Sequence, residues 1–231
     1  MKSPIILALD TKDKSVADSW ILATKESISV YKIGLELFLS IGIEGTSDLI
    51  KKHSIELFLD LKLHDIPNTV EQAVSSVSKL SPRFLTVHAS GGSEMIAAAN
   101  RAANKTSITA VTILTSLNDL DLGEIGYRSG ALDSAVNLAK LAVSAGATSI
   151  VCSPIEVKRI RESVPSSVAL ITPGVRPLDS ELGDQKRATT PKEAIENGAN
   201  FVVIGRPITS FANTSLQAMS ARAAQLASEL I

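Results

Sequence analysis

The segment LDLKLHDIPNTV, residues 59–70, places three charged side chains where an apolar strand should be forming. Side chains alternate across a strand, so Asp60 and Lys62 are predicted to project from one face and the neighbouring leucines from the other. Asp65 follows where Pro67 indicates that the chain has turned into a loop before a helix. One interpretation is an ordinary strand-end salt bridge, which contributes about 0–1 kcal/mol, with Asp65 capping the helix. Three alternating charges favour the other interpretation, an electrostatic site, because buried ions require partners.

Two more charged residues stand at the ends of the two preceding apolar runs. Lys32 lies in VYKIGL, residues 30–35, and Asp10 directly follows PIILAL, residues 4–9. Each of these residues alone has an unremarkable interpretation as a solvated strand end. Their occurrence on successive strands favours one shared site with Asp60 and Lys62.

Two later loops carry arginines suited to binding an anion. Arg176 occurs in PGVR, which begins at Pro173, and Arg206 follows Gly205 in IGRP. Arginine can bind phosphate oxygens in a bidentate manner, and the amide of a glycine can approach an anion closely. A single arginine after a strand is more often a solvated surface residue. Two on adjacent loops favour a phosphate site, as is common after the last two strands of an α/β barrel.

Eight short apolar runs, each followed by a longer polar or amphipathic segment, provide the elements that would position these residues. Near-continuous apolar runs are typical of parallel strands buried on both faces. Helical patterns occupy the segments between several of them, and Gly146 is suited to end the pattern at residues 133–146. The runs are residues 4–9, 30–35, 56–62, 83–89, 108–114, 148–153, 168–174 and 201–205, and the helical patterns are residues 70–80, 92–104 and 133–146.

This alternation predicts an α/β fold, with residues 1–231 forming one closed (β/α)₈ TIM barrel domain. A doubly wound open sheet is the weaker alternative, because no GxGxxG follows the first strand. Two connections, residues 116–130 and 173–191, are longer than a barrel needs. Both follow predicted strands, so they are expected on the face where barrel enzymes keep their active sites.

The composition limits which partners the protein is expected to bind and which cellular compartment it is expected to occupy. The net charge is −1 and the charges are dispersed, so we expect no nucleic-acid partner and no membrane-surface partner. The single cysteine, Cys152, excludes an internal disulfide framework and a cysteine-based zinc cage. The apolar start is too short for a signal peptide, and no apolar run approaches the roughly 18 residues of a membrane span. These features indicate a cytoplasmic protein.

The motif DLKLHDIPNT resembles the signature of the orotidine 5′-phosphate decarboxylase family, in which Asp-x-Lys-x-x-Asp precedes Ile-Pro-x-Thr. Further segments resemble the bacterial branch of that family, in the same order along the chain: LALD, YKIGLELF, TVHASGG, LTS, TPGVRP with a following GDQKR, and VIGRPIT. The resemblance implies conversion of orotidine 5′-monophosphate to uridine 5′-monophosphate, the last step of pyrimidine nucleotide synthesis. It also implies that no metal or organic cofactor is needed and that the enzyme is a homodimer.

The resemblance implies roles for the four matching charged residues. Lys62 is expected to donate the proton to a carbanion at C6 of the pyrimidine, and Asp60 to face the departing carboxylate. Lys32 is expected to hold Asp60 and a ribose hydroxyl. Asp65 would complete the alternating array.

Other matching residues are expected to bind the nucleotide. Ile66 and Thr69, together with Asp65, would reach into the neighbouring subunit's site, where Asp10 also addresses the ribose. Gln185 would bridge phosphate and base as the loop at residues 173–191 closes over the substrate. Thr115 and Ser116 would lie near the pyrimidine edge, and the sequence leaves open which of them makes the principal contact.

The sequence leaves two alternatives open. The first is a metal-dependent relative, a 3-keto-gulonate-6-phosphate decarboxylase or hexulose-phosphate synthase, which shares Asp-x-Lys-x-x-Asp but carries an acidic residue where this chain has Lys32. The second is a noncatalytic barrel that binds nucleotide phosphates. The cationic YKIG and the IPNT segment favour the nucleotide decarboxylase.

Overall fold

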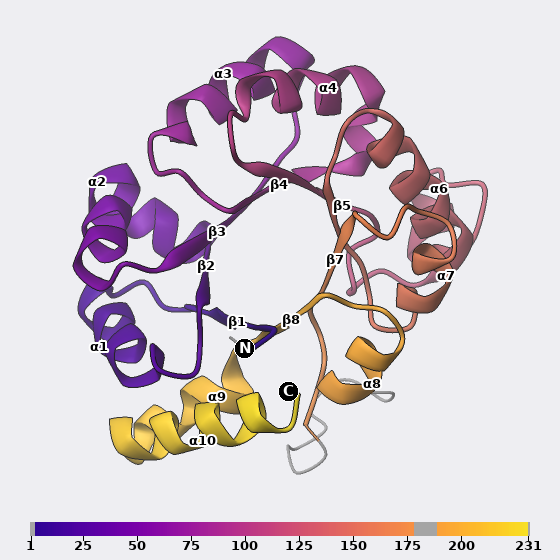
Figure 1. Cartoon of the computed structure of the whole chain (residues 1–231). Coiled ribbons are helices and arrows are strands. Elements are labelled where there is room, and N and C mark those ends of the chain that lie inside the picture. The colour runs from indigo at the N-terminus through magenta and orange to yellow at the C-terminus, as the bar shows by residue number, and fades with distance from the viewer. Residues whose placement is uncertain (1–2, 178–188, 231) are drawn as a thin grey trace.

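Eight parallel strands close into one barrel in this computed structural model, which describes residues 3–177 and 189–230. Each strand pairs with the next along the chain, and β8 pairs with β1 to complete the ring (Figure 1). The strands are β1 Ile5–Ala8, β2 Val30–Gly34, β3 Glu56–Leu63, β4 Phe84–His88, β5 Ser107–Val111, β6 Ser149–Val151, β7 Ala169–Thr172 and β8 Phe201–Ile204. The predicted TIM barrel and all eight predicted strands are confirmed.

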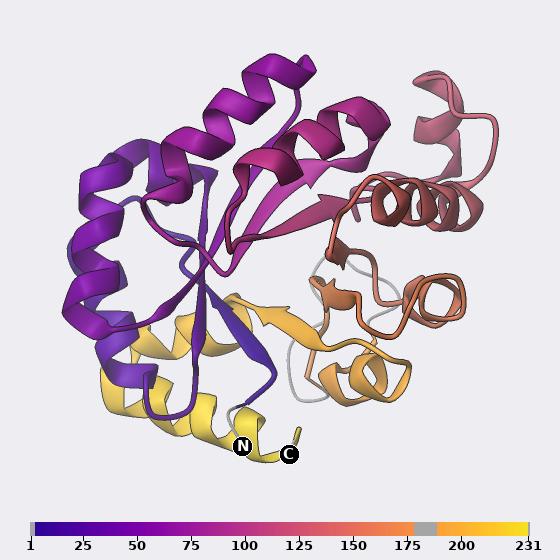
Figure 2. The same ribbon diagram turned by 45° about the horizontal axis from the view of Figure 1, so that its top comes forward.

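Helices surround the barrel on its outside (Figures 1 and 2). The three predicted helices are present as α3, α4 and α6, and Gly146 has a positive φ of 100° directly after the C-cap of α6, as its predicted role requires. The helices are α1 Lys14–Thr24, α2 Leu35–His53, α3 Pro67–Ser78, α4 Gly92–Ala102, α5 Asp119–Glu124, α6 Ala131–Ser144, α7 Val157–Arg161, α8 Pro191–Glu196, α9 Arg206–Thr209 and α10 Leu216–Ser228, with short 3₁₀ turns η1 Ala89–Gly91 and η2 Ser210–Asn213. The long connection at residues 116–130 therefore contains a helix of its own, α5.

The apolar residues form two layers separated by the barrel wall. The larger layer fills the space between strands and helices, and the smaller one lies on the opposite, inward-facing side of the strands. The smaller cluster consists of Ile6, Ala8, Val30, Phe58, Phe84, Ile171 and Val203. Because side chains alternate along each strand, the inward positions that follow these residues point toward the carboxyl end of the barrel. Three such positions hold Asp10, Lys32 and Asp60.

The pairing between β3 and β4 is interrupted at the charged segment. Leu59 pairs with Leu85, but the next pair joins Leu63 to Val87, so four steps along β3 match two along β4. Within this bulge Lys62 has a left-handed backbone with φ of 49°. Such a conformation costs a residue other than glycine about 1–3 kcal/mol, so the surrounding structure must hold it.

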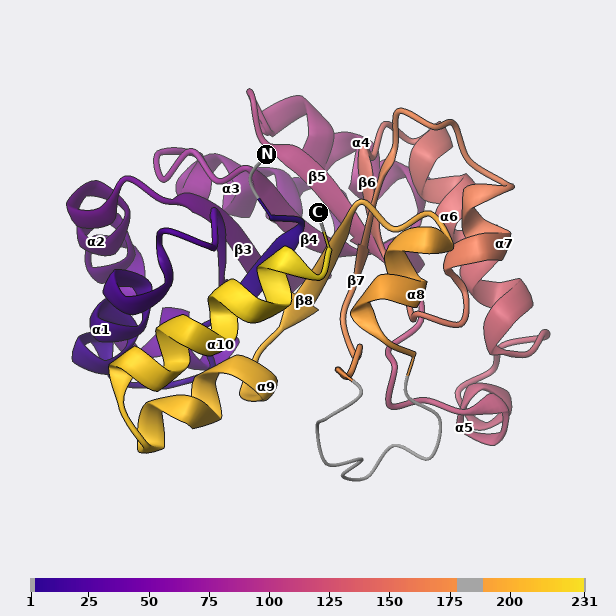
Figure 3. The same ribbon diagram turned by 60° about the horizontal axis from the view of Figure 1, so that its bottom comes forward.

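Figure 3 shows the two ends of the barrel: both termini lie at one end, and α5 and α9 lie toward the other. Since α5 and α9 follow β5 and β8, the second end is the one to which the strands' carboxyl ends point. In the described part of the chain, no helix is long and apolar enough to cross a membrane.

Candidate active site

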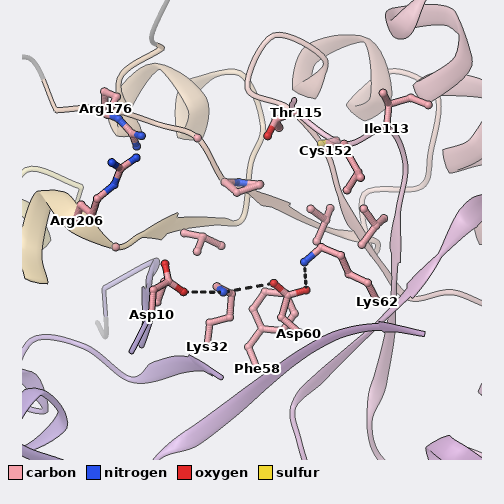
Figure 4. Close-up of a pocket in the computed structure, with 18 residues that line it drawn as sticks. Asp10, Lys32, Phe58, Asp60, Lys62, Ile113, Thr115, Cys152, Arg176 and Arg206 are labelled. Carbon is pink, nitrogen blue, oxygen red and sulfur yellow. Dashed lines mark hydrogen bonds and ion pairs between the residues drawn. The ribbon is translucent and has the colours of Figure 1, made fainter. Parts of the chain in front are cut away.

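A cavity of about 320 Å³ opens at the carboxyl end of the barrel (Figure 4). Strands β1, β2, β3, β5, β6, β7 and β8, or the loops that follow them, contribute to its wall. The lining residues are Ala8, Asp10, Lys32, Phe58, Asp60, Lys62, Val111, Ile113, Leu114, Thr115, Val151, Cys152, Pro173, Gly174, Arg176, Val203, Gly205 and Arg206. Nine of the residues predicted for the site are therefore brought together in one cavity: Asp10, Lys32, Asp60, Lys62, Thr115, Pro173, Arg176, Gly205 and Arg206.

Four of these side chains form a continuous chain of alternating charge along one wall (Figure 4). Lys62 Nζ lies 2.8 Å from Asp60 Oδ1, and Lys32 Nζ lies 3.4 Å from Asp60 Oδ2. Lys32 Nζ also lies 3.3 Å from Asp10 Oδ1. The parallel register explains this contact, because Lys32 is aligned with Ala8 on β1 and with Phe58 on β3.

Asp60 is the central anion of this chain. Its burial by itself would raise the pKa of the carboxyl group, but the charges of Lys32 and Lys62 and hydrogen bonds from Lys62 and Thr86 together hold that pKa below its ordinary value. Only 12% of the Asp60 side chain is exposed, so these contacts act in a setting with little solvent screening. Asp60 is consequently an anion at neutral pH.

The loops after β7 and β8 carry the two predicted arginines, Arg176 and Arg206. The guanidinium groups of Arg176 and Arg206 point toward one another in Figure 4. Two cations that converge in this way provide a site for a doubly charged anion such as a phosphate. Gly205 directly precedes Arg206, and a Cβ added there would lie 3.3 Å from Asp10 Oδ2 and 3.4 Å from Ala8 Cβ. A side chain at position 205 would thus crowd the edge of the cavity next to the arginines.

The rest of the wall is largely apolar, and the sequence motifs did not identify it. Val111, Ile113, Leu114, Val151 and Cys152 form this side of the cavity. One feature of the sequence did indicate this wall: the predicted apolar run at residues 108–114 extends past the end of β5 at Val111. Cys152 is buried as predicted, and burial raises the pKa of its thiol. An apolar wall of this kind suits the face of a flat heterocycle.

The two candidates for the pyrimidine edge differ in position. Both are exposed, but Thr115 lines the cavity and Ser116 does not belong to the lining. The position of Thr115 makes it the better candidate for a contact with the base. Gln185 falls outside the described residues.

Asp65, Ile66 and Thr69 lie outside this cavity and are exposed. The Asp65 carboxylate accepts a hydrogen bond from the Ile66 amide at 2.7 Å, and the N-cap of α3 is Ile66, without a side-chain cap. Asp65 therefore does not cap the helix, and it does not extend the chain of alternating charges within this subunit.

Known proteins with similar sequences indicate the family of this chain. The sequence profile described as "Orotidine 5'-phosphate decarboxylase / HUMPS family" matches residues 3–220. The orotidine 5′-phosphate decarboxylase of Thermobifida fusca is 48% identical over 230 residues, which cover 100% of this chain and 97% of the relative. The enzyme of the same name from Gluconobacter oxydans is 40% identical, with 94% of each chain covered.

Solved structures show the same relationship in three dimensions. The crystal structure of orotidine 5′-phosphate decarboxylase from Lactobacillus acidophilus superimposes with a TM-score of 0.82 at 34% identity. The match covers 97% of this chain and 99% of that one. An uncharacterised conserved protein from Geobacillus kaustophilus gives a TM-score of 0.79 at 30% identity, with 96% and 99% coverage. The profile match and the full-length identities show that this chain belongs to the orotidine 5′-phosphate decarboxylase / HUMPS family.

Proposed function

We infer that this chain is a carboxy-lyase that converts orotidine 5′-monophosphate to uridine 5′-monophosphate and CO₂, in pyrimidine biosynthesis. The observation that carries this inference is that a row of alternating charges shares one cavity with two converging arginines. The row consists of Asp10, Lys32, Asp60 and Lys62. The arginines suit the 5′-phosphate, the apolar wall suits the pyrimidine, and the charge chain then lies beside the reacting end of the base.

We propose that Lys62 supplies the proton. The bond between C6 and the carboxyl carbon breaks, its electron pair stays on C6, and CO₂ leaves. The Lys62 ammonium then transfers one proton to C6, which yields uridine 5′-monophosphate, and the neutral amine regains a proton from water. A fixed cation close to C6 stabilises the developing carbanion without reorganisation during the reaction, and such preorganised charge is often the largest contribution to catalysis.

Asp60 is proposed to hold Lys62 and to lie near the substrate carboxylate. Two neighbouring carboxylates repel one another in the bound state, and this repulsion disappears as the substrate carboxylate becomes neutral CO₂. Phosphate binding by Arg176 and Arg206 would offset the repulsion on binding. Lys32 and Asp10 are proposed to bind the ribose hydroxyls, and Thr115 the base. Pro173, Gly205 and Gln185 keep their predicted roles in binding the nucleotide.

The geometry disfavours the metal-dependent alternative. The Lys32 ammonium lies 3.3 Å from Asp10 and 3.4 Å from Asp60, so a cation of the protein already occupies the space between these carboxylates. A divalent ion placed there would be repelled by Lys32 and Lys62. A barrel that only binds phosphates is also disfavoured, because a buried anion at Asp60 weakens the binding of an anionic ligand. An enzyme can use that repulsion, whereas a binding protein cannot.

We also propose that the enzyme is a homodimer in which Asp65, Ile66 and Thr69 enter the partner's site. Ile66 is 66% exposed. Helix α2 follows β2, the strand next to β3, and its residues Leu35 and Leu39 are 49% and 78% exposed. Exposed apolar side chains close to a site entrance are typical of an interface between subunits. A two-fold axis at this surface would bring the loop after β3 of one subunit to the cavity of the other.

A complementation experiment tests the shared site. Lys62→Ala and Asp65→Ala proteins, each inactive alone, are mixed, dissociated and reassembled. Hybrid dimers then contain one site with both changes and one intact site, so mixing in equal amounts should restore about a quarter of wild-type activity. If the mixture stays as inactive as its components while hybrids form, Asp65 does not act across the interface.

We further propose that the chain acts as a single catalytic domain, residues 1–231, in the cytoplasm. Cys152 is a buried free thiol, which is typical of a reducing compartment.

The assignment of Lys62 is tested by turnover of orotidine 5′-monophosphate in D₂O. The wild-type protein should produce uridine 5′-monophosphate with deuterium at C6, because the Lys62 ammonium exchanges with solvent. Lys62→Ala should lower kcat by more than about 1,000-fold, since it removes both the proton donor and the fixed charge. Lys79→Ala, at an exposed position after α3, is the matched control and should leave turnover unchanged. Full turnover by Lys62→Ala would rule out the proposed role.

A further inference from the structure

The bulge in β3 raises the question of what holds Lys62 in its left-handed conformation. Where two strands lose register, backbone groups in the bulge lose their ladder partners and require others. The residue of β4 that faces the bulge is Thr86, between Leu85 and Val87, which are the partners of Leu59 and Leu63. Thr86 is completely buried and does not line the substrate cavity.

The Thr86 hydroxyl makes both of its hydrogen bonds to this bulge. Its Oγ1 accepts a hydrogen bond from the Lys62 backbone N–H at 2.8 Å and donates one to Asp60 Oδ1 at 3.0 Å. The same Oδ1 accepts the hydrogen bond from Lys62 Nζ at 2.8 Å. The backbone of Lys62, its ammonium group, Asp60 and Thr86 therefore form one closed ring of contacts.

We propose that Thr86 is a positioning residue, whose hydroxyl holds the Lys62 backbone in the bulge and orients the Asp60 carboxylate against the Lys62 ammonium. This inference rests on the proposed function, because it concerns the groups assigned to the decarboxylation. A hydroxyl is suited to the position because it can donate one hydrogen bond and accept another within the space of a small side chain. A purely apolar residue of the same shape would leave a buried amide and a buried carboxylate oxygen each without one partner.

The test compares valine and serine at position 86 with a matched threonine elsewhere. Thr86→Val keeps the shape and removes the hydroxyl, and Thr86→Ser keeps the hydroxyl. Thr109→Val is the control, because Thr109 is also completely buried, lies opposite Thr86 on β5, and directs its hydroxyl to Ser149 and the Ser107 carbonyl. If circular dichroism shows that Thr86→Val does not fold, Thr86→Ala replaces it in the same comparison.

We expect Thr86→Val to lower kcat by about 10- to 100-fold relative to Thr109→Val, the range for a lost hydrogen bond to a charged group. The dissociation constant of uridine 5′-monophosphate should change by less than about threefold, because phosphate and base contacts lie elsewhere in the cavity. Thr86→Ser should recover kcat to within about threefold of wild type. Equal kcat values for Thr86→Val and Thr109→Val, an equally impaired Thr86→Ser, or an equal loss of nucleotide binding would each overturn the inference.

A titration that needs no turnover separates this inference from the proposed function. The groups around Asp60 are Lys32 from β2, Lys62 from β3, and Thr86 and His88 from β4. Lys32 also contacts Asp10. Because the Thr86 hydroxyl stabilises the Asp60 anion, Thr86→Val should raise the pKa of Asp60 in carbon NMR of the labelled carboxyl group, and Thr109→Val should not. An unchanged titration in Thr86→Val would contradict the hydrogen bond. A wild-type protein that does not consume orotidine 5′-monophosphate would overturn the proposed function, whereas the titration would still decide the role of Thr86.

Discussion

Replacing Asp60 by asparagine should destabilise the folded protein, because it removes the anion that lies between two lysines. Asparagine has the same shape as aspartate, so the change removes charge with little change in packing. Lys32 and Lys62 would then face each other across a neutral amide in a poorly solvated site.

The distances give the size of the effect. At an effective dielectric constant of 20, contacts of 2.8 Å and 3.4 Å correspond to attractions of about 6 and about 5 kcal/mol. Most of this attraction is offset by the cost of removing three ions from water. Removing one partner of a buried pair nevertheless costs about 3–5 kcal/mol, because the remaining charge loses its compensation. We expect a loss of this size in the free energy of unfolding for Asp60→Asn at pH 7.

The pKa of Asp60 also determines how this stabilisation depends on pH. The folded-state pKa of Asp60 is lower than its ordinary value of 3.8, so the stabilisation is present above that value and is lost as the pH falls through the folded-state pKa. The difference between wild type and Asp60→Asn should therefore be largest near neutral pH and should decrease in strong acid.

Urea unfolding followed by circular dichroism, at one fixed protein concentration, measures this difference. Asp10→Asn is the control, since Asp10 is 62% exposed and contacts Lys32 from the other side. A pair with one exposed partner contributes less than about 1 kcal/mol, so Asp10→Asn should be nearly as stable as wild type. If Asp60→Asn is as stable as Asp10→Asn at pH 7, Asp60 does not neutralise the two lysines and the electrostatic account of this wall is wrong.

Three further changes have defined outcomes. Arg206→Ala should weaken binding of orotidine 5′-monophosphate by about 10- to 150-fold in calorimetry, as expected for loss of a charge-assisted hydrogen bond. Orotidine, which has no phosphate, should bind the wild-type and Arg206→Ala proteins equally. If orotidine binding is weakened as well, Arg206 does not contact the phosphate. Burial raises the pKa of Glu156 to about 7 from an ordinary 4.5, so its charge costs stability as the pH rises through this interval. Urea unfolding should show Glu156→Gln gaining about 2–3 kcal/mol over wild type between pH 5 and pH 8, and a constant difference would contradict the raised pKa. If the protein is the proposed homodimer, Ile66→Asp should convert it to monomers in sedimentation velocity, while Ile155→Asp, at another exposed isoleucine, should not. A dimeric Ile66→Asp protein would refute the proposed interface.

Much of the site could be predicted because it depends on local patterns. Alternation along a strand places Asp60 and Lys62 on the inner face with Leu59 on the outer one, and this arrangement is observed. The charged residues at the ends of β1 and β2 become neighbours of Asp60 because successive parallel strands pair in a barrel. Arg176 and Arg206 converge for the same reason, since each follows one of two adjacent strands.

The features that were missed depend on relations between strands. The bulge in β3 is a difference in register between β3 and β4, and neither strand reveals it alone. Thr86 was overlooked because a threonine in an apolar strand is unremarkable, although its inward position in TVHASGG was a usable signal. The interface roles of Asp65, Ile66 and Thr69 concern a second subunit and remain predictions.

The proposed decarboxylase activity is tested by the consumption of orotidine 5′-monophosphate by the purified wild-type protein in the presence of EDTA. Loss of the substrate's ultraviolet absorbance measures the reaction, and chromatography identifies the product. We expect complete conversion to uridine 5′-monophosphate at a rate that the chelator does not change. A folded, dimeric sample that leaves the substrate intact, or that instead shows chelator-sensitive activity on a sugar phosphate, would contradict the proposed activity.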